Sequence, residues 1–310
     1  MAWFFTGRER AKVLCPNGLC GHVGRGAPPG AEGRAHVCRK CRQALPRGSR
    51  NGAEPVVVMV VGTHWCGKTS WLVRGIGRLS EGPYELEFPI EGQAEAWRAL
   101  KGGLDCGRPV PATPAVPGAA WCIDFFKGKA GRRAYVHDTG GSDEGDAAVF
   151  MRYRILGRVD ALVAVVDPFG IPAVWKKHGP AVKDMRPAVR PSREAFGATQ
   201  VSSLLQALET LRKGRRRERW EIPVAVVLTK LDVLGLGRSF GDCATATVES
   251  VDLACRKQLE QWGYGNLERL LEARFCRSVF FACQPTGAGA FSADAPLVWA
   301  VEEAESIRER

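Results

Sequence analysis

The sequence predicts an α/β fold in which helices cover both faces of a mostly parallel sheet of about six strands. Three observations lead to this expectation. Short apolar runs alternate with amphipathic, helix-length segments from about residue 55 onward. The 310 residues are 45% hydrophobic and 25% charged, which suits a globular protein with one sizeable core. Four of the eleven cysteines fall in the first 41 residues, which predicts a small module in front of the sheet.

The expected strands are short runs rich in β-branched and aromatic residues. Residues 56–61 are apolar throughout, as in a strand that is buried on both faces. The further strands are expected, in chain order, at 121–126, 133–137, 161–166, 223–228 and 279–282. Helical periodicity predicts the intervening elements, with helices expected at 69–79, 202–212, 251–262 and 295–308.

We expect two domains. Residues 1–50 hold the cysteine module and a basic linker, and residues 51–310 hold the α/β domain. Two insertions exceed a minimal domain of this type: about 82–117, which is rich in Gly and Pro, and about 168–200, which is basic. Long connections on such a scaffold are functional or without fixed structure, and the sequence leaves both alternatives open.

A glycine-rich loop after the first strand is predicted to bind the phosphates of a nucleotide. It reads Gly62-Thr63-His64-Trp65-Cys66-Gly67-Lys68-Thr69, followed by Ser70, and matches the pattern GxxxxGK[ST] between a strand and a helix. The glycines let the backbone N–H groups and the helix N-terminus face the phosphates. Lys68 adds a positive charge there, and the Thr69 hydroxyl is a ligand for Mg²⁺.

A strand that ends in Asp138-Thr-Gly-Gly141 supplies a second motif, of the form DxxG. Asp138, at the carboxyl end of the strand, is expected to hold Mg²⁺ through water. The backbone N–H of Gly141 is expected to sense the γ-phosphate, so that the following segment acts as a switch.

The third motif, Thr229-Lys230-Leu231-Asp232, follows an apolar strand and predicts which base is bound. The Asp232 carboxylate can accept hydrogen bonds from the ring N–H and the exocyclic amine of guanine. Adenine offers no such pair of donors and would leave the acid unpaired. The aliphatic part of Lys230 would cover the base.

Together these motifs resemble the TRAFAC-class, Ras-like GTPase superfamily over about residues 55–300. More narrowly, the chain resembles the bacterial double-GTPase proteins of conflict systems, through Val165-Val-Asp-Pro-Phe-Gly-Ile-Pro172 and Pro296-Leu-Val-Trp-Ala300. The resemblance implies a P-loop GTPase fold, GTP and GDP as ligands, and Mg²⁺-dependent GTP hydrolysis coupled to a switch. It also implies a protein effector or activating partner encoded alongside.

The resemblance also assigns roles to individual residues. Thr113, the only threonine in the 82–117 insertion, stands for the switch I threonine. Ala282 and Cys283 stand where the backbone reads the guanine oxygen, although the family's serine is absent there. The glutamine that orients the attacking water is replaced by Ser142, so hydrolysis is expected to be slow or partner-activated. His64, Ser142 or a residue from a partner or second protomer could position that water. The resulting candidate catalytic residues are Lys68, Thr113, Asp138, Gly141 and Ser142.

The N-terminal cysteines predict a structural zinc site. Cys15, Cys20, Cys38 and Cys41 form C-x₄-C and C-x₂-C pairs separated by seventeen residues. His22 and His36 are alternative ligands, and a redox or catalytic use of the cysteines is the alternative function. Metal binding would supply much of the folding free energy of this zinc ribbon. We expect the ribbon to dock a partner protein.

The charge pattern leaves nucleic acid open as a further ligand. The formal net charge is +11, and residues 1–50 hold ten Arg or Lys against two Glu. Segments 176–193 and 212–219 are also basic. No apolar run reaches the ~20 residues of a membrane span, and no secretory signal is evident, so we expect a cytoplasmic protein without a membrane partner. Two alternatives to the GTPase switch stay open: a non-hydrolysing, GTP-bound adaptor, and a nucleic-acid-binding GTPase similar to ribosome-assembly factors.

Overall fold

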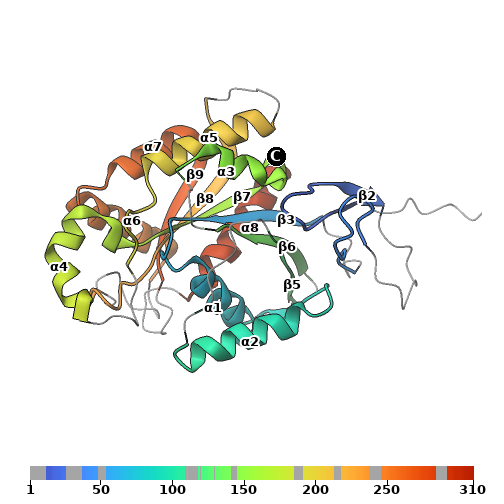
Figure 1. Ribbon diagram of the computed structural model, residues 1–310, viewed down its shortest axis with the longest axis horizontal. Helices are drawn as coiled ribbons and strands as arrows, with labels where there is room; N and C mark the ends of the chain where they lie inside the picture. Colours follow the sequence, from blue (N-terminus) through green and yellow to red (C-terminus); the bar gives the residue numbers. More distant parts are fainter. Residues whose placement is uncertain are drawn as a thin grey trace, which may run out of the picture.

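The computed structural model describes residues 12–25, 37–47, 54–108, 110, 118, 120–128, 130–140, 145–184, 191–212, 218–236, 240, 246–283 and 292–310. This part of the chain forms a two-stranded sheet at the N-terminus and a seven-stranded sheet with the strand order β4-β5-β6-β3-β7-β8-β9 (Figure 1). The two-stranded sheet pairs β1 (Lys12–Leu14) with β2 (Val23–Arg25) in antiparallel fashion.

Five strands of the large sheet run parallel to one another. They are β3 (Val56–Val61), β6 (Ala130–Asp138), β7 (Ala161–Val166), β8 (Trp220–Leu228) and β9 (Phe275–Ala282). An antiparallel extension follows on the β6 side, made of β5 (Trp121–Lys127) and β4 (Glu85–Glu87). The mostly parallel α/β sheet is therefore confirmed, but the predicted number of about six strands is one too low. The strand that was missed, β4, has one apolar residue, Leu86, between two glutamates, so it carries no recognisable pattern.

Eight α-helices lie in the described part of the chain. Their bounds are α1 (Lys68–Glu81), α2 (Gln93–Asp105), α3 (Ala147–Arg152), α4 (Pro172–Asp184), α5 (Ala198–Leu211), α6 (Val248–Gln261), α7 (Asn266–Arg274) and α8 (Ala295–Arg308). Two short 3₁₀ turns accompany them, η1 (Arg154–Arg158) and η2 (Pro168–Gly170). Figure 1 shows α1 and α2 on one side of the sheet and α5 and α7 on the other.

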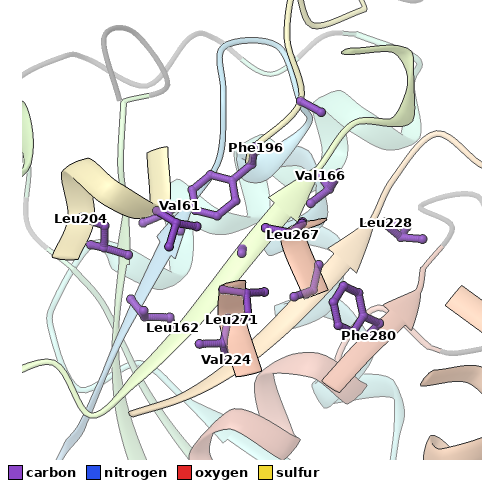
Figure 2. Close-up of a cluster of buried hydrophobic side chains, with 14 of the residues drawn as sticks. Val61, Leu162, Val166, Phe196, Leu204, Val224, Leu228, Leu267, Leu271 and Phe280 are labelled. Carbon is purple, nitrogen blue, oxygen red and sulfur yellow. The ribbon is translucent and has the colours of Figure 1, made fainter. Parts of the chain in front are cut away.

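The central strand β3 packs against helices on both of its faces, because successive side chains of a strand point in opposite directions. Val56, Val58 and Val60 belong to a buried cluster with residues of α1, α2 and α8. Val57, Met59 and Val61 belong to a second cluster with residues of α3, α5, α6 and α7. Figure 2 shows part of this second cluster, with its side chains from the sheet facing those from the helices. The continuous apolar run thus serves two cores at once.

The two insertions contain regular structure within their described residues. The first holds β4 and α2, and α2 packs on α1, where the indole Nε1 of Trp97 donates to the Val73 carbonyl at 3.1 Å. The second holds η2, α4 and a segment that leads to α5. Thr113 lies outside the described residues.

The N-terminal module is attached to the sheet domain by backbone hydrogen bonds. The carbonyl of Pro16 accepts from the N–H of Ala120 at 2.8 Å, and the carbonyl of Gly18 accepts from the N–H of Ile155 at 3.1 Å. Arg133 of β6 donates to the Arg47 carbonyl at 2.8 Å. The module therefore contacts β6, η1 and the start of β5, away from α4 (Figure 1).

Candidate functional site

The carboxyl ends of the parallel strands meet at one edge of the sheet, where Thr69, Asp138 and the segment after β8 lie. The N–H of Thr139, after β6, donates to Val60 at the end of β3 at 3.2 Å. The N–H of Thr229, after β8, donates to Val166 at the end of β7 at 3.1 Å. Loops at this edge of an open α/β sheet are where such folds bind ligands.

The loop between β3 and α1 is closely fitted to its surroundings. A Cβ atom on Gly62 would lie 2.6 Å from the Val165 carbonyl oxygen and 2.8 Å from the Cys66 sulfur, so only glycine fits. Gly67, with a φ of 93°, directly precedes α1 in a backbone conformation that glycine adopts at little cost. Trp65 also has a positive φ, 66°, and its side chain is 40% exposed.

Lys68 is a buried cation within this loop. Its ammonium donates to the carbonyl oxygens of Gly62 and Thr63, the latter at 3.1 Å, and the residue is 6% exposed. The hydrogen bonds of the Lys68 ammonium thus keep its positive charge next to the backbone of residues 62 and 63.

Thr69 and Asp138 meet across two elements. The Thr69 hydroxyl, at the start of α1, donates to the Asp138 carboxylate, at the end of β6, at 2.6 Å. A hydroxyl beside a carboxylate provides the hard oxygen ligands that Mg²⁺ prefers. The chemistry of this donor pair therefore fits the predicted magnesium ligands.

The segment that follows β8 is fastened to the same loop. The Thr229 hydroxyl donates to the Cys66 carbonyl at 2.8 Å, and the Lys230 ammonium donates to the Trp65 carbonyl at 2.6 Å. Thr229 is buried and Lys230 is half-buried, whereas Asp232 is exposed. Thr229 and Lys230 therefore fix where the backbone that leads to Asp232 leaves the sheet.

Asp167 was not predicted to belong to the site, yet it joins three of its segments. It is fully buried, directly follows β7, and forms an ion pair with Lys230 at 2.6 Å. Its carboxylate also accepts from the N–H groups of Phe169 at 3.0 Å and Ser192 at 2.7 Å. The available signal was an acidic residue directly after the apolar run 161–166.

The segment 191–197 crosses the glycine-rich loop, which the sequence did not predict either. The Ser192 hydroxyl donates to the His64 carbonyl at 2.8 Å, and the Thr63 hydroxyl donates to the Glu194 carbonyl at 2.8 Å. Gly170 lets the segment pass, because a Cβ there would lie 2.2 Å from the Glu194 carbonyl carbon. Burial, then the charge of Lys68, then that of Arg193 lower the pKa of His64, so its imidazole is neutral near pH 7.

The remaining predicted residues lie partly at this edge. Ser70 continues α1 and is half-buried, while Ala282 and Cys283 are buried at the end of β9. The N–H of Cys283 donates to Leu228 at 3.3 Å, which places this segment beside the end of β8. Gly141 and Ser142 lie outside the described residues, as do parts of the basic segments 176–193 and 212–219.

The four N-terminal cysteines form a separate candidate metal centre. Their sulfur atoms all lie within 4.8 Å of one another, with Cys15 and Cys41 at 3.5 Å and Cys20 and Cys38 at 3.7 Å. Zinc–sulfur bonds of about 2.3 Å in a tetrahedron space the sulfurs about 3.8 Å apart, so the group fits zinc. His22 is not part of the group, and His36 lies outside the described residues.

The thiols of this group differ in acidity. Burial raises the pKa of Cys15 and of Cys20. Burial also opposes ionisation of Cys38, but the backbone N–H groups of Cys41 and Lys40 outweigh it and lower the pKa of Cys38 to about 7. A thiolate is the form that binds a metal, so the lowered pKa of Cys38 favours coordination by this residue.

No protein-family model matches this chain, and no curated protein matches it in sequence. Within the described ranges, no helix is long and apolar enough to cross a membrane.

Proposed function

We propose that this protein is a Mg²⁺-dependent, GTP-binding and GTP-hydrolysing switch with a P-loop GTPase fold and a zinc ribbon that docks a partner. The observation that carries this proposal is that two distant motifs converge on the glycine-rich loop and the start of α1. Thr69 meets Asp138, 69 residues away, and Thr229 meets the Cys66 carbonyl, 163 residues away. Each contact joins residues that the sequence assigns to the same nucleotide.

The phosphate end of the ligand would lie on the loop 62–69. Lys68 would neutralise phosphate charge, and the N–H groups at the start of α1 would donate to phosphate oxygens. Thr69 and Asp138 would hold Mg²⁺, which supplies further positive charge on the phosphates when it is bound. The 2.6 Å separation of their oxygens supports this shared role.

The base would lie on the 229–232 segment. Thr229 and Lys230 are bonded to loop carbonyls, so base and phosphate sites are held at a fixed spacing. Asp232 is exposed, and its carboxylate would accept from guanine, while Asp167 would support this contact indirectly by fixing Lys230.

Calorimetry with GTP, GDP and ATP, with and without Mg²⁺, tests nucleotide binding and base choice. We expect guanine-selective binding that Asp232→Ala removes. Glu218→Ala is the matched control, because it removes an exposed acid at the opposite end of β8. Equal binding of ATP and GTP would refute the role of Asp232 and leave a generic nucleoside triphosphatase.

Turnover is tested separately by the release of inorganic phosphate from GTP. We expect slow, Mg²⁺-dependent hydrolysis that Lys68→Ala abolishes. Tight GTP binding with no phosphate release, alone or with added partner, would instead favour the non-hydrolysing adaptor.

A further inference from the structure

We propose that Arg193, which lies in the second insertion of this chain, is a catalytic arginine that contacts the γ-phosphate of GTP. This inference rests on the proposed GTPase function. It adds an exposed cation to the site beside the two lysines, whose ammonium groups are bonded within the protein. Lys68 is bonded to Gly62 and Thr63, and Lys230 is bonded to Asp167 and Trp65.

The backbone on both sides of Arg193 is fastened to the glycine-rich loop. Ser192 bonds through its hydroxyl to the His64 carbonyl at 2.8 Å, and the Glu194 carbonyl accepts from the Thr63 hydroxyl at 2.8 Å. Ser192 also donates its N–H to the buried Asp167 at 2.7 Å. Two hydrogen bonds of Ser192 and one of Glu194 therefore hold the Cα of Arg193 beside loop positions 63 and 64.

The contacts of Ser192 and Glu194, on either side of Arg193, differ from those of an ordinary surface turn. Asp167 is fully buried and Ser192 is 4% exposed, so the anchor is shielded from water. Gly170 makes room for the segment, because a Cβ there would collide with the backbone of Glu194 and Ala195 at 2.2 Å. The fold thus fixes the approach of this segment to the loop.

The side chain of Arg193 is itself exposed and uncommitted. Among the residues that the structure describes, none accepts a hydrogen bond from its guanidinium and no carboxylate lies within ion-pair distance. Its charge is felt at the loop, since it lowers the pKa of His64 together with Lys68. An anchored backbone with an unpaired guanidinium beside a phosphate loop is the arrangement expected of a residue that meets an anionic ligand.

The chemical step needs such a cation. The oxygen of a water molecule attacks the γ-phosphorus, and the bond from that phosphorus to the oxygen bridging the β- and γ-phosphates breaks. The electron pair stays on the bridging oxygen, which leaves with GDP. Both protons of the water remain on the inorganic phosphate, which leaves as H₂PO₄⁻ and then equilibrates with the solvent. Arg193 stays protonated throughout and donates hydrogen bonds to oxygens on which negative charge grows.

The experiment compares Arg193→Ala and Arg193→Lys with the matched control Arg158→Ala. Arg158 is also exposed but precedes β7, at the opposite end of the strand from Asp167. Two quantities are measured: single-turnover GTP hydrolysis with Mg²⁺, and the affinity for GDP with and without aluminium fluoride, which mimics the phosphoryl group in transfer. Urea unfolding confirms that each variant is folded.

We expect Arg193→Ala to slow hydrolysis at least about a hundredfold and to lose the gain in GDP affinity that aluminium fluoride gives the wild type. Its affinity for GDP alone should stay within about twofold of the wild type, and Arg193→Lys should fall between the two, because lysine keeps the charge but not the planar fork. Arg158→Ala should behave as the wild type.

Wild-type hydrolysis and fluoride response in Arg193→Ala would overturn the inference and leave the GTPase assignment standing. An equal loss in Arg158→Ala would overturn it as well, because the effect would then follow net charge. Guanine nucleotide binding without hydrolysis or fluoride response in the wild type would also overturn it and favour the adaptor. A wild-type protein that binds no nucleotide would refute the proposed function and this inference with it.

Discussion

The cysteine module and the seven-stranded sheet are organised by different forces. Within the described residues, the buried cluster of the module consists of Cys15, Cys20 and Cys38, with Cys41 and Leu45 packed against it. The sheet instead separates two large apolar clusters that run through most of its helices. Apolar burial can stabilise the sheet by itself, whereas a module of this size would depend on a metal held by its four cysteines. The folding of the module would thus depend on a bound metal, whereas the folding of the sheet domain would not.

Loss of the metal should give the largest effect and should be confined to the module. Structural zinc sites of this type contribute on the order of 10 kcal/mol to folding. We expect Cys38→Ser to abolish bound zinc and to remove hydrogen-exchange protection in residues 12–25, while β3 stays protected. Cys106→Ser, which removes an exposed thiol of the sheet domain, is the control. Loss of protection in β3 at the same time would show that the two regions fold as one unit.

The converse test destabilises the sheet domain and leaves the module intact, by creating a cavity in the core of the sheet. Phe280 is fully buried in β9, and its ring lies 4.7 Å from the Arg256 guanidinium carbon. Phe280→Ala should lower the free energy of unfolding by about 3–5 kcal/mol in urea titrations and leave the zinc content at the wild-type level. Leu253→Ala, at a side chain that is 69% exposed, should change the free energy of unfolding little. Loss of zinc in Phe280→Ala would show that the stability of the module depends on the core of the sheet domain.

The contact between the two regions can be tested at Arg133. This residue forms a buried ion pair with Asp124 at 2.6 Å and donates to the Arg47 carbonyl of the module. Arg133→Ala leaves a buried carboxylate unpaired, which should cost about 3 kcal/mol in urea unfolding and should increase exchange in residues 37–47. The neighbouring Arg132, whose partners Glu302 and Glu305 are more exposed, should cost less than about 1 kcal/mol when changed to alanine. Equal losses of unfolding free energy in Arg133→Ala and Arg132→Ala would show that the buried ion pair of Arg133 contributes no more than a surface ion pair.

The smallest effect is expected at the edge of the sheet domain, where helix α6 begins. The Thr247 hydroxyl accepts from the Ser250 N–H at 3.2 Å and caps the helix. Thr247→Ala should lower the free energy of unfolding by about 1 kcal/mol. Thr247→Ser retains the cap and should restore most of that loss. A wild-type midpoint in Thr247→Ala would show that the helix end does not contribute to global stability.

The sequence predicted best where one residue pattern decides one element. Residues 56–61 match β3 to the residue, because six consecutive apolar residues suit only a strand between two cores. The prediction failed where the pattern is mixed: α4 contains Pro180 and several basic residues, and α7 lies in a stretch with alternating charges. These helices owe their positions to tertiary packing, α4 against η2 and α7 against β9, which local propensity does not express.

For the candidate site, the motifs predicted the loop and its neighbours but not the residues that join them. Thr69 and Asp138 were expected near one metal, and the structure places them in direct contact. Asp167 bonds to Lys230 at a separation of 63 residues, and Ser192 bonds to His64 at a separation of 128. Such long-range contacts depend on where the crossover connections return to the sheet, so a local sequence pattern cannot predict them.

The conformation of Trp65 has a spectroscopic consequence. Of the tryptophans in the described ranges it alone is exposed, whereas Trp71, Trp97 and Trp220 are buried. Its ring lies at the tip of the glycine-rich loop and stands edge-on to His64, with centroids 4.5 Å apart. Iodide should quench this indole before the others, and a ligand that covers the loop should protect it. The protein therefore carries its own fluorescent reporter of loop occupancy, and Trp65→Phe identifies the signal.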